Sequence, residues 1–150
     1  MRKSKINISG FKIGTAENRE GLTGVTVILA PDGGATAGVD VRGCAPGTRE
    51  TDLLDPRKTV QKIHAVVLSG GSAFGLEAAS GCVKYLAEQG VGFPIGNVCV
   101  PIVCSAVLFD LMIGDEKAYP DLLMGYEAAK SASSEFLSGC NGAGTGATVG

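Results

Sequence analysis

The sequence is poor in several residue types that many protein classes need. Its 150 residues include no tryptophan, one histidine (His64), and 19% charged residues, with a formal net charge of −2. This charge gives no basic field for phosphate backbones or anionic lipids. The longest apolar run, Val98 to Met112, is broken by Pro101 and Asp110 and is too short to cross a bilayer. We therefore expect no nucleic-acid partner and no membrane partner.

The sequence also lacks the signals of secretion and of metal binding. The basic start, Met1 to Lys5, is not followed by a continuous apolar stretch or a small-residue cleavage site. The five cysteines are odd in number and form no C-x-x-C pair, which disfavours a disulfide framework and a zinc site. We expect a cytoplasmic protein without metal or cofactor, in which most cysteines are small buried hydrophobes.

Hydrophobic residues and glycine are abundant by contrast. Hydrophobic residues make up 45% of the chain, which is typical of a soluble globular domain, and the length suits one domain over residues 1–150. The 23 glycines are not periodic and lie among Val, Ile and Ala. They therefore mark tight turns and close packing rather than disorder.

Hydrophobic patterning predicts strands that form hairpins, with two helices between them, and hence an α+β layered sandwich rather than a regular βαβ array. Val25–Ala30 and Ala35–Val41 flank a Pro-Asp-Gly-Gly turn and predict an antiparallel hairpin. The later segments predict, in order, a long loop at 42–56, a strand ending near Gly71, a helix ending at a Gly90 cap, a buried strand region at 100–114, a helix at about 120–134, and a glycine-rich loop at 139–150 that leads toward another strand.

The first helix contains four consecutive small residues, Ala78, Ala79, Ser80 and Gly81. Glycine inside a helix lowers its stability by roughly 1 kcal/mol but lets another backbone approach closely. We therefore expect this helix to pack tightly against a neighbour.

No nucleophile with a partner is visible. Ser72 lies at a strand-to-helix turn, but Phe74 stands where a nucleophile elbow needs its second glycine, so a helix N-cap is the better interpretation. His64 lies inside an apolar strand and is expected to be a satisfied core or interface histidine. Cys104 has no neighbouring cation to stabilise a thiolate and is expected to be buried.

The remaining motifs have ordinary explanations. The glycine-rich segment from Gly139 lacks the Lys-Ser/Thr of a phosphate-binding loop, so nucleotide binding is not expected. Carboxylates at Asp110, Asp115, Glu116 and Asp121 flank the second strand and helix, where solvated turns and helix N-terminal charges account for them.

Four segments together resemble one family. GVDVRGCAPGTRETDLL, LSGGSAFGLEAASG, VPIVCSAVLFDLMIGDEKAYPD and GAGTGATVG occur in the order found in the autoprocessing L-aminopeptidase/D-amino-acid esterase family, which includes the β-peptidyl aminopeptidases. They cover nearly the whole chain, and the nylon-oligomer hydrolases are a more distant branch. The chain resembles the amino-terminal portion of that family.

The resemblance implies an αββα four-layer sandwich, similar to the N-terminal-nucleophile hydrolases and shared with ornithine acetyltransferase, which would be incomplete in residues 1–150. It implies a precursor that cuts itself and exposes a Ser or Thr as the nucleophile, whose free α-amine serves as base. The nucleophile, its helpers, the oxyanion asparagine and a lysine used by some members would all lie after Gly150. No catalytic residue is therefore expected in this chain.

The resemblance further implies that this chain supplies walls of the substrate pocket, namely Gly70, Gly71, Ser72, Phe109, Gly144 and Thr145. Some relatives have an active-site tyrosine at the position of Phe109, and its hydroxyl is absent here. Phe109 is expected to wall the pocket hydrophobically.

The expected function is thus that of the amino-terminal part of an aminopeptidase, amidase or esterase acting on small peptides, amides or esters. The expected partners are a carboxy-terminal β-subunit and further copies of the protein. Two alternatives remain open: an acyltransferase of the ornithine acetyltransferase type, and a non-catalytic truncated fragment or assembly subunit. The resemblance does not decide whether α- or β-residues, or L- or D-residues, are released.

Overall fold

The computed structural model describes residues 2–149. Its elements, in chain order, are β1 (Arg2–Lys5), β2 (Lys12–Asn18), β3 (Thr23–Leu29), β4 (Thr48–Arg49), η1 (Asp52–Leu54), β5 (Ala65–Ser69), η2 (Ser72–Glu77), α1 (Ala78–Glu88), β6 (Phe93–Ile95), β7 (Val98–Val100), β8 (Val103–Val107), α2 (Leu122–Lys130), β9 (Glu135–Ser138) and η3 (Gly142–Gly144).

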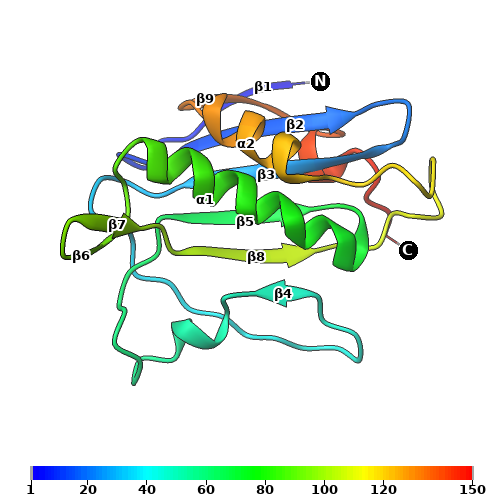
Figure 1. The fold of residues 1–150 in the computed structure, drawn as a ribbon. Helices are drawn as coiled ribbons and strands as arrows, with labels where there is room; N and C mark the ends of the chain where they lie inside the picture. The colour runs from blue at the N-terminus through cyan, green and yellow to red at the C-terminus, as the bar shows by residue number, and fades with distance from the viewer. Residues whose placement is uncertain (1, 150) are drawn as a thin grey trace.

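A five-stranded sheet forms the centre of the fold, in the order β2-β3-β5-β8-β4. Its neighbouring strands are antiparallel except β5 and β8, which are parallel and are joined by a crossover through α1. Helices α1 and α2 lie side by side on one face of this sheet (Figure 1). The α+β prediction is confirmed, with one βαβ unit inside a mainly antiparallel sheet.

The alternation of side chains along β3 shows which face is the core. Val25, Val27 and Leu29 are buried beneath the helices, whereas Thr26 and Ile28 point to the opposite face and are half-buried. Each fully buried valine contributes roughly 1.5–3 kcal/mol relative to an exposed one. The helix-facing side therefore supplies most of the apolar burial.

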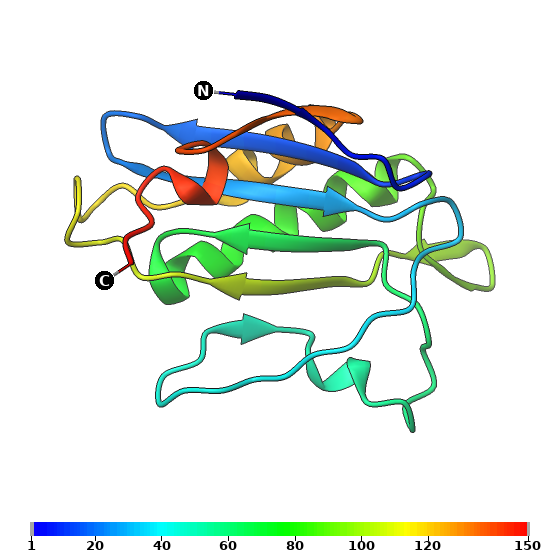
Figure 2. The ribbon, with the colours of Figure 1, turned by 180° about the vertical axis from the view of Figure 1, so that it is seen from behind.

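The other face of the sheet is largely uncovered. Seen from behind, η3 and the extended segment that leads to β4 lie over parts of it, and β1 passes over one end of β2 (Figure 2). Leu68 of β5 points to this face with 39% of its surface exposed. The chain thus forms one helical layer and one sheet, which is two of the four layers of an αββα sandwich; a second sheet on the open face stays a prediction.

The predicted hairpin between residues 25–30 and 35–41 is wrong. The turn forms, with the Gly34 N–H donating to the Pro31 carbonyl at 2.9 Å, but beyond it only Ala35 makes a bridge, to Ile63. A strand has two hydrogen-bonding edges, and β2 and β5 occupy both edges of β3. Residues 36–41 therefore run on without a strand partner.

The predicted close packing of α1 is confirmed. A Cβ at Gly81 would overlap the carbonyl oxygen of Leu122, and a Cβ at Gly125 would overlap that of Ala78. Each helix thus presents a glycine to the backbone of the other. The predicted cap is also confirmed, because Gly90 has φ +68° and Val91 N–H donates to the Leu86 carbonyl across the end of α1.

The later boundaries differ from the prediction. The predicted strand region at 100–114 begins inside β7, a short strand in a hairpin with β6, and continues after Pro101 as β8. The second helix has Asp121 as its N-cap, which accepts from Met124 N–H at 2.8 Å, and it ends at Lys130. The chain then forms β9 against β1, and no strand is present at 145–149.

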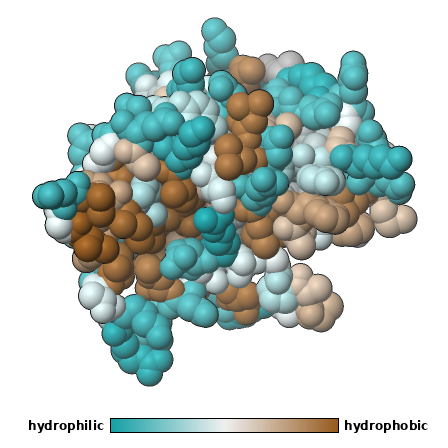
Figure 3. Space-filling model, viewed as in Figure 1, coloured by the Kyte–Doolittle hydropathy of each residue, from teal (hydrophilic) through white to brown (hydrophobic). Residues whose placement is uncertain are grey.

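The β6–β7 hairpin carries an exposed apolar surface. Ile95 is 56% exposed and Val98 is 59% exposed. In the space-filling view, the hydrophobic area on the left of the molecule lies at the position of this hairpin (Figure 3).

Within residues 2–149, no helix has the length and apolar character to span a membrane.

We expect Gly81→Ala to destabilise the protein by about 1–3 kcal/mol, although alanine favours a helix by about 1 kcal/mol, because the new methyl group meets the Leu122 carbonyl oxygen. Urea unfolding measures the change. Gly38→Ala is the control, since a Cβ at Gly38 meets nothing within 4 Å, and its effect should stay within about 0.5 kcal/mol. Equal losses in both variants would contradict the helix contact.

Candidate functional site

The parallel pairing of β5 and β8 brings two predicted site segments together at the carboxyl ends of these strands. Ser69 of β5 is paired with Val107 of β8, so the chain leaves both strands side by side. Leu108 N–H donates to the Ser69 carbonyl at 2.9 Å, and Ser72 N–H donates to the Leu108 carbonyl at 3.0 Å. The Gly70–Ser72 turn therefore lies directly against residues 108–110.

The turn adopts a backbone conformation that side chains rarely accept. Gly71 has φ +79° and Ser72 has φ +53°. The predicted N-cap role of Ser72 is wrong, because Gly71 occupies the cap position of η2 and no side chain caps that helix. Ser72 is the first residue of η2, half-buried, with its hydroxyl free of hydrogen bonds to residues 2–149.

The backbone donors of the predicted site residues are already used inside the protein. Gly70 N–H donates to the Gly24 carbonyl, and Gly71 N–H donates to Oδ1 of Asp110 at 2.6 Å. Thr145 N–H donates to the Gly142 carbonyl in the same way. In this conformation these segments offer a substrate their side chains and carbonyls rather than backbone N–H groups.

The second predicted segment, Gly144 and Thr145, lies over the end of β3 on the open face. Ala143 N–H donates to Oγ1 of Thr26 at 3.1 Å, and Gly142 N–H donates to Glu17 at 3.3 Å. These two bonds hold η3 on the strands below it.

A hollow of about 310 Å³ separates η3 from the ends of β5 and β8. Its lining includes Leu68, Leu108 and Gly144 and is mainly apolar. Gly144 is the one predicted wall residue in this lining, while Ser69 and Leu108 bring the hollow next to the Gly70–Ser72 turn and Phe109 in the chain. Their contact with a substrate stays a prediction.

Thr145 carries an unsatisfied polar group beside this hollow. Its Oγ1 is buried and finds no hydrogen-bond partner among residues 2–149. A buried hydroxyl without a partner costs about 1–3 kcal/mol. This hydroxyl is therefore available to a group that lies outside the described residues.

Phe109 directly follows Leu108 at the same edge and is 61% exposed. Its ring is therefore available as an apolar wall, and its place in a substrate pocket stays a prediction. It provides no hydroxyl for a reacting amide.

Asp110 is a site feature that sequence reasoning missed. It was expected at a solvated turn, but it is 3% exposed, and that expectation is wrong. Its Oδ2 accepts from the Thr23 hydroxyl at 2.7 Å and its Oδ1 accepts from Gly71 N–H. The available signal was a carboxylate inside the apolar run AVLFDLM, since a charge in such a run is costly unless it is hydrogen-bonded.

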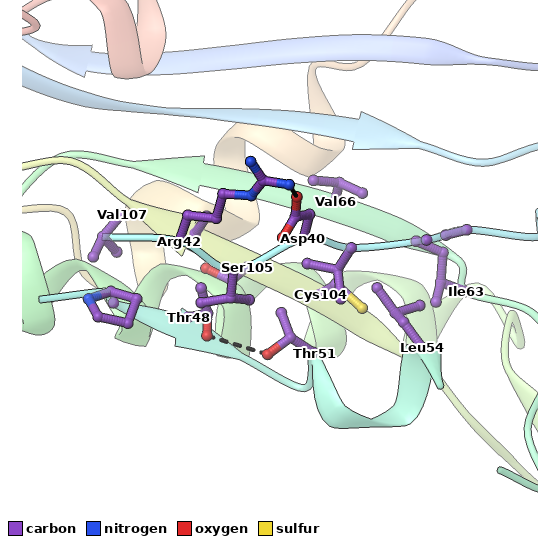
Figure 4. Close-up of a pocket in the computed structure, with 17 residues that line it drawn as sticks. Asp40, Arg42, Thr48, Thr51, Leu54, Ile63, Val66, Cys104, Ser105 and Val107 are labelled. Atoms are coloured by element: carbon purple, nitrogen blue, oxygen red, sulfur yellow. Dashed lines mark hydrogen bonds and ion pairs between the residues drawn. The ribbon is translucent and has the colours of Figure 1, made fainter. Parts of the chain in front are cut away.

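A second hollow, of about 320 Å³, lies between β8 and the segment 37–48 (Figure 4). Val66, Cys104 and Leu54 form apolar parts of its wall. At its rim an ion pair joins Asp40 and Arg42 at 2.6 Å, and both side chains are mostly exposed. The sequence indicated only a long loop here, because the hollow forms where that loop passes over β8.

His64 is a satisfied core histidine, as predicted. It is 6% exposed, and its Nδ1 accepts from Ile102 N–H at 3.1 Å. Burial lowers the pKa of His64, because the charged imidazolium is disfavoured away from water. The imidazole therefore stays neutral where an exposed histidine would begin to protonate.

We expect the free energy of unfolding to fall as the pH drops below about 6.5, the ordinary histidine pKa, because the unfolded chain then binds a proton that buried His64 resists. Denaturant titrations at several pH values measure this. His64→Gln, whose amide oxygen can accept from Ile102 N–H, should show a weaker dependence between about pH 7 and about pH 5.5. An unchanged dependence would exclude His64 as its source.

The cysteines divide into two classes, and the prediction that most are buried is wrong. Cys82 and Cys104 are buried, whereas Cys44, Cys99 and Cys140 are exposed because they lie in loops or in the short β7 strand. Burial raises the pKa of Cys82 to about 12 and also raises the pKa of Cys104. The predicted burial of Cys104 is confirmed, and a high thiol pKa is the opposite of what a nucleophile needs.

We expect three of the five thiols to react rapidly with iodoacetamide in the native protein, namely the exposed ones. Mass spectrometry of peptides after a short exposure locates the modified residues. Cys82 and Cys104 should become modified only after denaturant is added. Rapid native modification of Cys104 would contradict its burial on β8.

The chain resembles known proteins both in sequence and in fold. The model of Peptidase family S58 matches residues 5–150.

Residues 2–149 contain no group of three His, Cys, Asp or Glu side chains placed to hold a metal ion.

Among curated proteins, an uncharacterized aminopeptidase of Mycobacterium tuberculosis is 47% identical over 127 residues, which is 85% of this chain and 37% of the relative. A 6-aminohexanoate-oligomer endohydrolase of Paenarthrobacter ureafaciens is 36% identical over 147 residues, which is 97% of this chain and 39% of the relative. The chain thus spans well under half the length of these relatives.

Among solved structures, the PH0078 protein of Pyrococcus horikoshii has a TM-score of 0.75 at 22% identity, over 94% of this chain and 44% of that one. A Burkholderia sp. beta-aminopeptidase has a TM-score of 0.68 at 19% identity, over 93% of this chain and 41% of that one. The ornithine acetyltransferase of M. tuberculosis reaches 0.50 at 16% identity, over 97% and 78% of the two chains. At these identities the likeness concerns the fold.

Proposed function

Because the chain belongs to peptidase family S58, we propose that it is the amino-terminal part of a hydrolase that releases amino-terminal residues from small peptides, amides or esters. The observation that carries this proposal is the family match over residues 5–150. Relatives named as an aminopeptidase and as an amide-oligomer hydrolase support the same class of reaction. The bond broken in the proposed reaction is an amide or an ester.

The proposed mechanism uses a Ser or Thr nucleophile that lies downstream of residue 150 and is exposed by self-cleavage. The freed α-amine takes the proton of the hydroxyl as it attacks the carbonyl carbon, and water later releases the acyl group. An asparagine and backbone N–H groups of the downstream part would hold the oxyanion. This division fits a chain in which the Ser72 hydroxyl has no hydrogen-bond partner among residues 2–149, while burial and the nearby Glu50 raise the pKa of the Cys104 thiol.

In this proposal the present chain supplies one side of the substrate pocket. Gly144 lines the hollow of about 310 Å³, and so do Ser69 and Leu108, which directly precede the Gly70–Ser72 turn and Phe109 in the chain. We expect the turn, Phe109 and Thr145 to extend these walls around the substrate. The apolar lining favours an apolar substrate group, and the free hydroxyl of Thr145 supplies a polar contact. The backbone N–H groups of the Gly70–Ser72 turn and of Gly144 and Thr145 already have partners within the protein, which supports placing the oxyanion donors downstream.

A second candidate is an acyltransferase, which would pass the acyl group to an amine instead of water. The fold likeness to ornithine acetyltransferase favours keeping it. The chemistry up to the acyl-enzyme would be the same, so the acceptor decides between the two. Supplying an amine acceptor to the full-length protein and measuring acyl-amine against free acid separates them.

The proposal includes two partners and a compartment. A carboxy-terminal β-subunit would cover the open sheet face, where Leu68 is exposed, and further copies would pack on the apolar β6–β7 hairpin. A cytoplasmic location is supported by five free thiols, three of them exposed. Size-exclusion chromatography with light scattering tests the oligomeric state.

We expect the purified 150-residue chain to hydrolyse no aminoacyl p-nitroanilide, because its described part holds no activated nucleophile. The full-length protein that carries this chain should hydrolyse the same compound and should appear as two pieces on a denaturing gel. Turnover by the 150-residue chain alone would place the nucleophile inside it. An uncut and inactive full-length protein would overturn the proposed function.

A further inference from the structure

Asp110 is a buried carboxylate at the point where four segments of the chain meet. It follows β8, and it binds the hydroxyl of Thr23 at the start of β3 and the N–H of Gly71 after β5. Gly146 packs against its side chain, since a Cβ there would lie 2.9 Å from both the Cβ and Oδ2 of Asp110. A Cβ at Gly70 would overlap the same Oδ2. Glycines on two segments thus make room for one carboxylate.

The chemistry of this contact is costly for a residue that only fills space. Asp110 is 3% exposed, and no cation among residues 2–149 forms an ion pair with it. An apolar side chain of similar volume is often as stabilising as a buried charge, or more so. A carboxylate here is explained by its two short hydrogen bonds, which are stronger than bonds between neutral groups.

One of these bonds acts on the strained turn. Gly71 and Ser72 both have positive φ, a conformation that serine adopts rarely. The N–H of Gly71 is held by Asp110, and the N–H of Ser72 is held by the Leu108 carbonyl. These bonds to residues 108–110 therefore fix the backbone at Ser72, and with it the direction in which its side chain leaves the turn.

We propose that Asp110 is a positioning residue of the candidate site, which fixes the Gly70–Ser72 turn to β3 and to the segment around Gly146. Through these contacts the Gly70–Ser72 turn and the segment around Gly146 keep one relative arrangement. Asp110 itself is buried beneath the turn and touches no substrate. Its effect on turnover rests on the proposed function, whereas the coupling of the two segments does not.

Hydrogen exchange of the full-length protein tests the coupling without any substrate. In Asp110→Leu, which keeps the forked shape of the side chain with larger methyl groups and removes both acceptors, amides of residues 70–76 and 142–148 should exchange at least about tenfold faster, with the core strands unchanged. Asp115→Asn is the matched control, since Asp115 is exposed and binds only the nearby Lys117 N–H. Faster exchange in one segment alone, or in neither, would overturn the proposal.

Thr23 provides a second variant that should fold even if Asp110→Leu does not. Thr23→Val removes one bond to the carboxylate with almost no change in volume, and Thr23→Ser keeps the hydroxyl. Exchange in both segments should rise in the valine variant and return toward the original rate in the serine variant. Equal rates in the two variants would overturn the proposal.

Kinetics then test the consequence for the proposed reaction. With aminoacyl p-nitroanilide, Asp110→Leu should lower kcat per titrated active site by about tenfold or more with a smaller change in KM, because misplaced walls misalign the reacting bond. A loss of stability alone would reduce the number of active sites and leave kcat per site unchanged, which would overturn the positioning role. If the original protein shows no turnover, the proposed function fails, and the exchange result still decides the coupling.

Discussion

The parallel contact between β5 and β8 is the constraint on which the site depends. Every other pair of neighbours in the central sheet is antiparallel, so a turn at one strand end normally faces the start of the next strand. The α1 crossover makes β5 and β8 run in the same direction and end together. As a result, two chain segments about forty positions apart leave the sheet side by side and exchange hydrogen bonds.

The crossover in turn depends on very close packing. Helix α1 returns the chain over the sheet and must share one face with α2, and small residues let the two helix backbones approach each other. The buried valines of β3 lie below this pair. Because the apolar burial is concentrated on this face, the opposite face remains free to carry the hollows and the loops that line them.

The arrangement separates support from chemistry. Asp110 accepts from the Gly71 N–H, and η3 donates to Thr26 and Glu17 of the strands below it, so little donor capacity is left for a substrate from these backbone segments. What remains for a substrate is the exposed ring of Phe109, the half-buried side chain of Ser72 and an apolar hollow. Such a surface can position a substrate group, and it fits the proposed role of a pocket wall that needs a nucleophile from elsewhere.

Local sequence patterns determined a large part of this protein. The small residues of α1, the glycine cap at Gly90, the strand-turn-helix around Ser72 and the burial of His64 all followed from short-range spacing, because helix packing and turn geometry use residues that are close in the chain. The ordered glycine motifs were also enough to identify the family. Each of these features is a property of one segment.

Tertiary structure decided the pairings and the environment of single groups. β3 pairs with β2 and β5, so residues 36–41 have no strand partner and Ala35 makes a single bridge to Ile63. A local turn signal cannot predict this, since each edge of β3 pairs with the strand that packs best over the core. From its local sequence Asp110 is expected at a solvated turn, whereas in the fold Thr23 and Gly71 donate hydrogen bonds to its buried carboxylate. Burial of a charge and formation of a hollow depend on residues far apart in the chain, so only the folded arrangement fixes them.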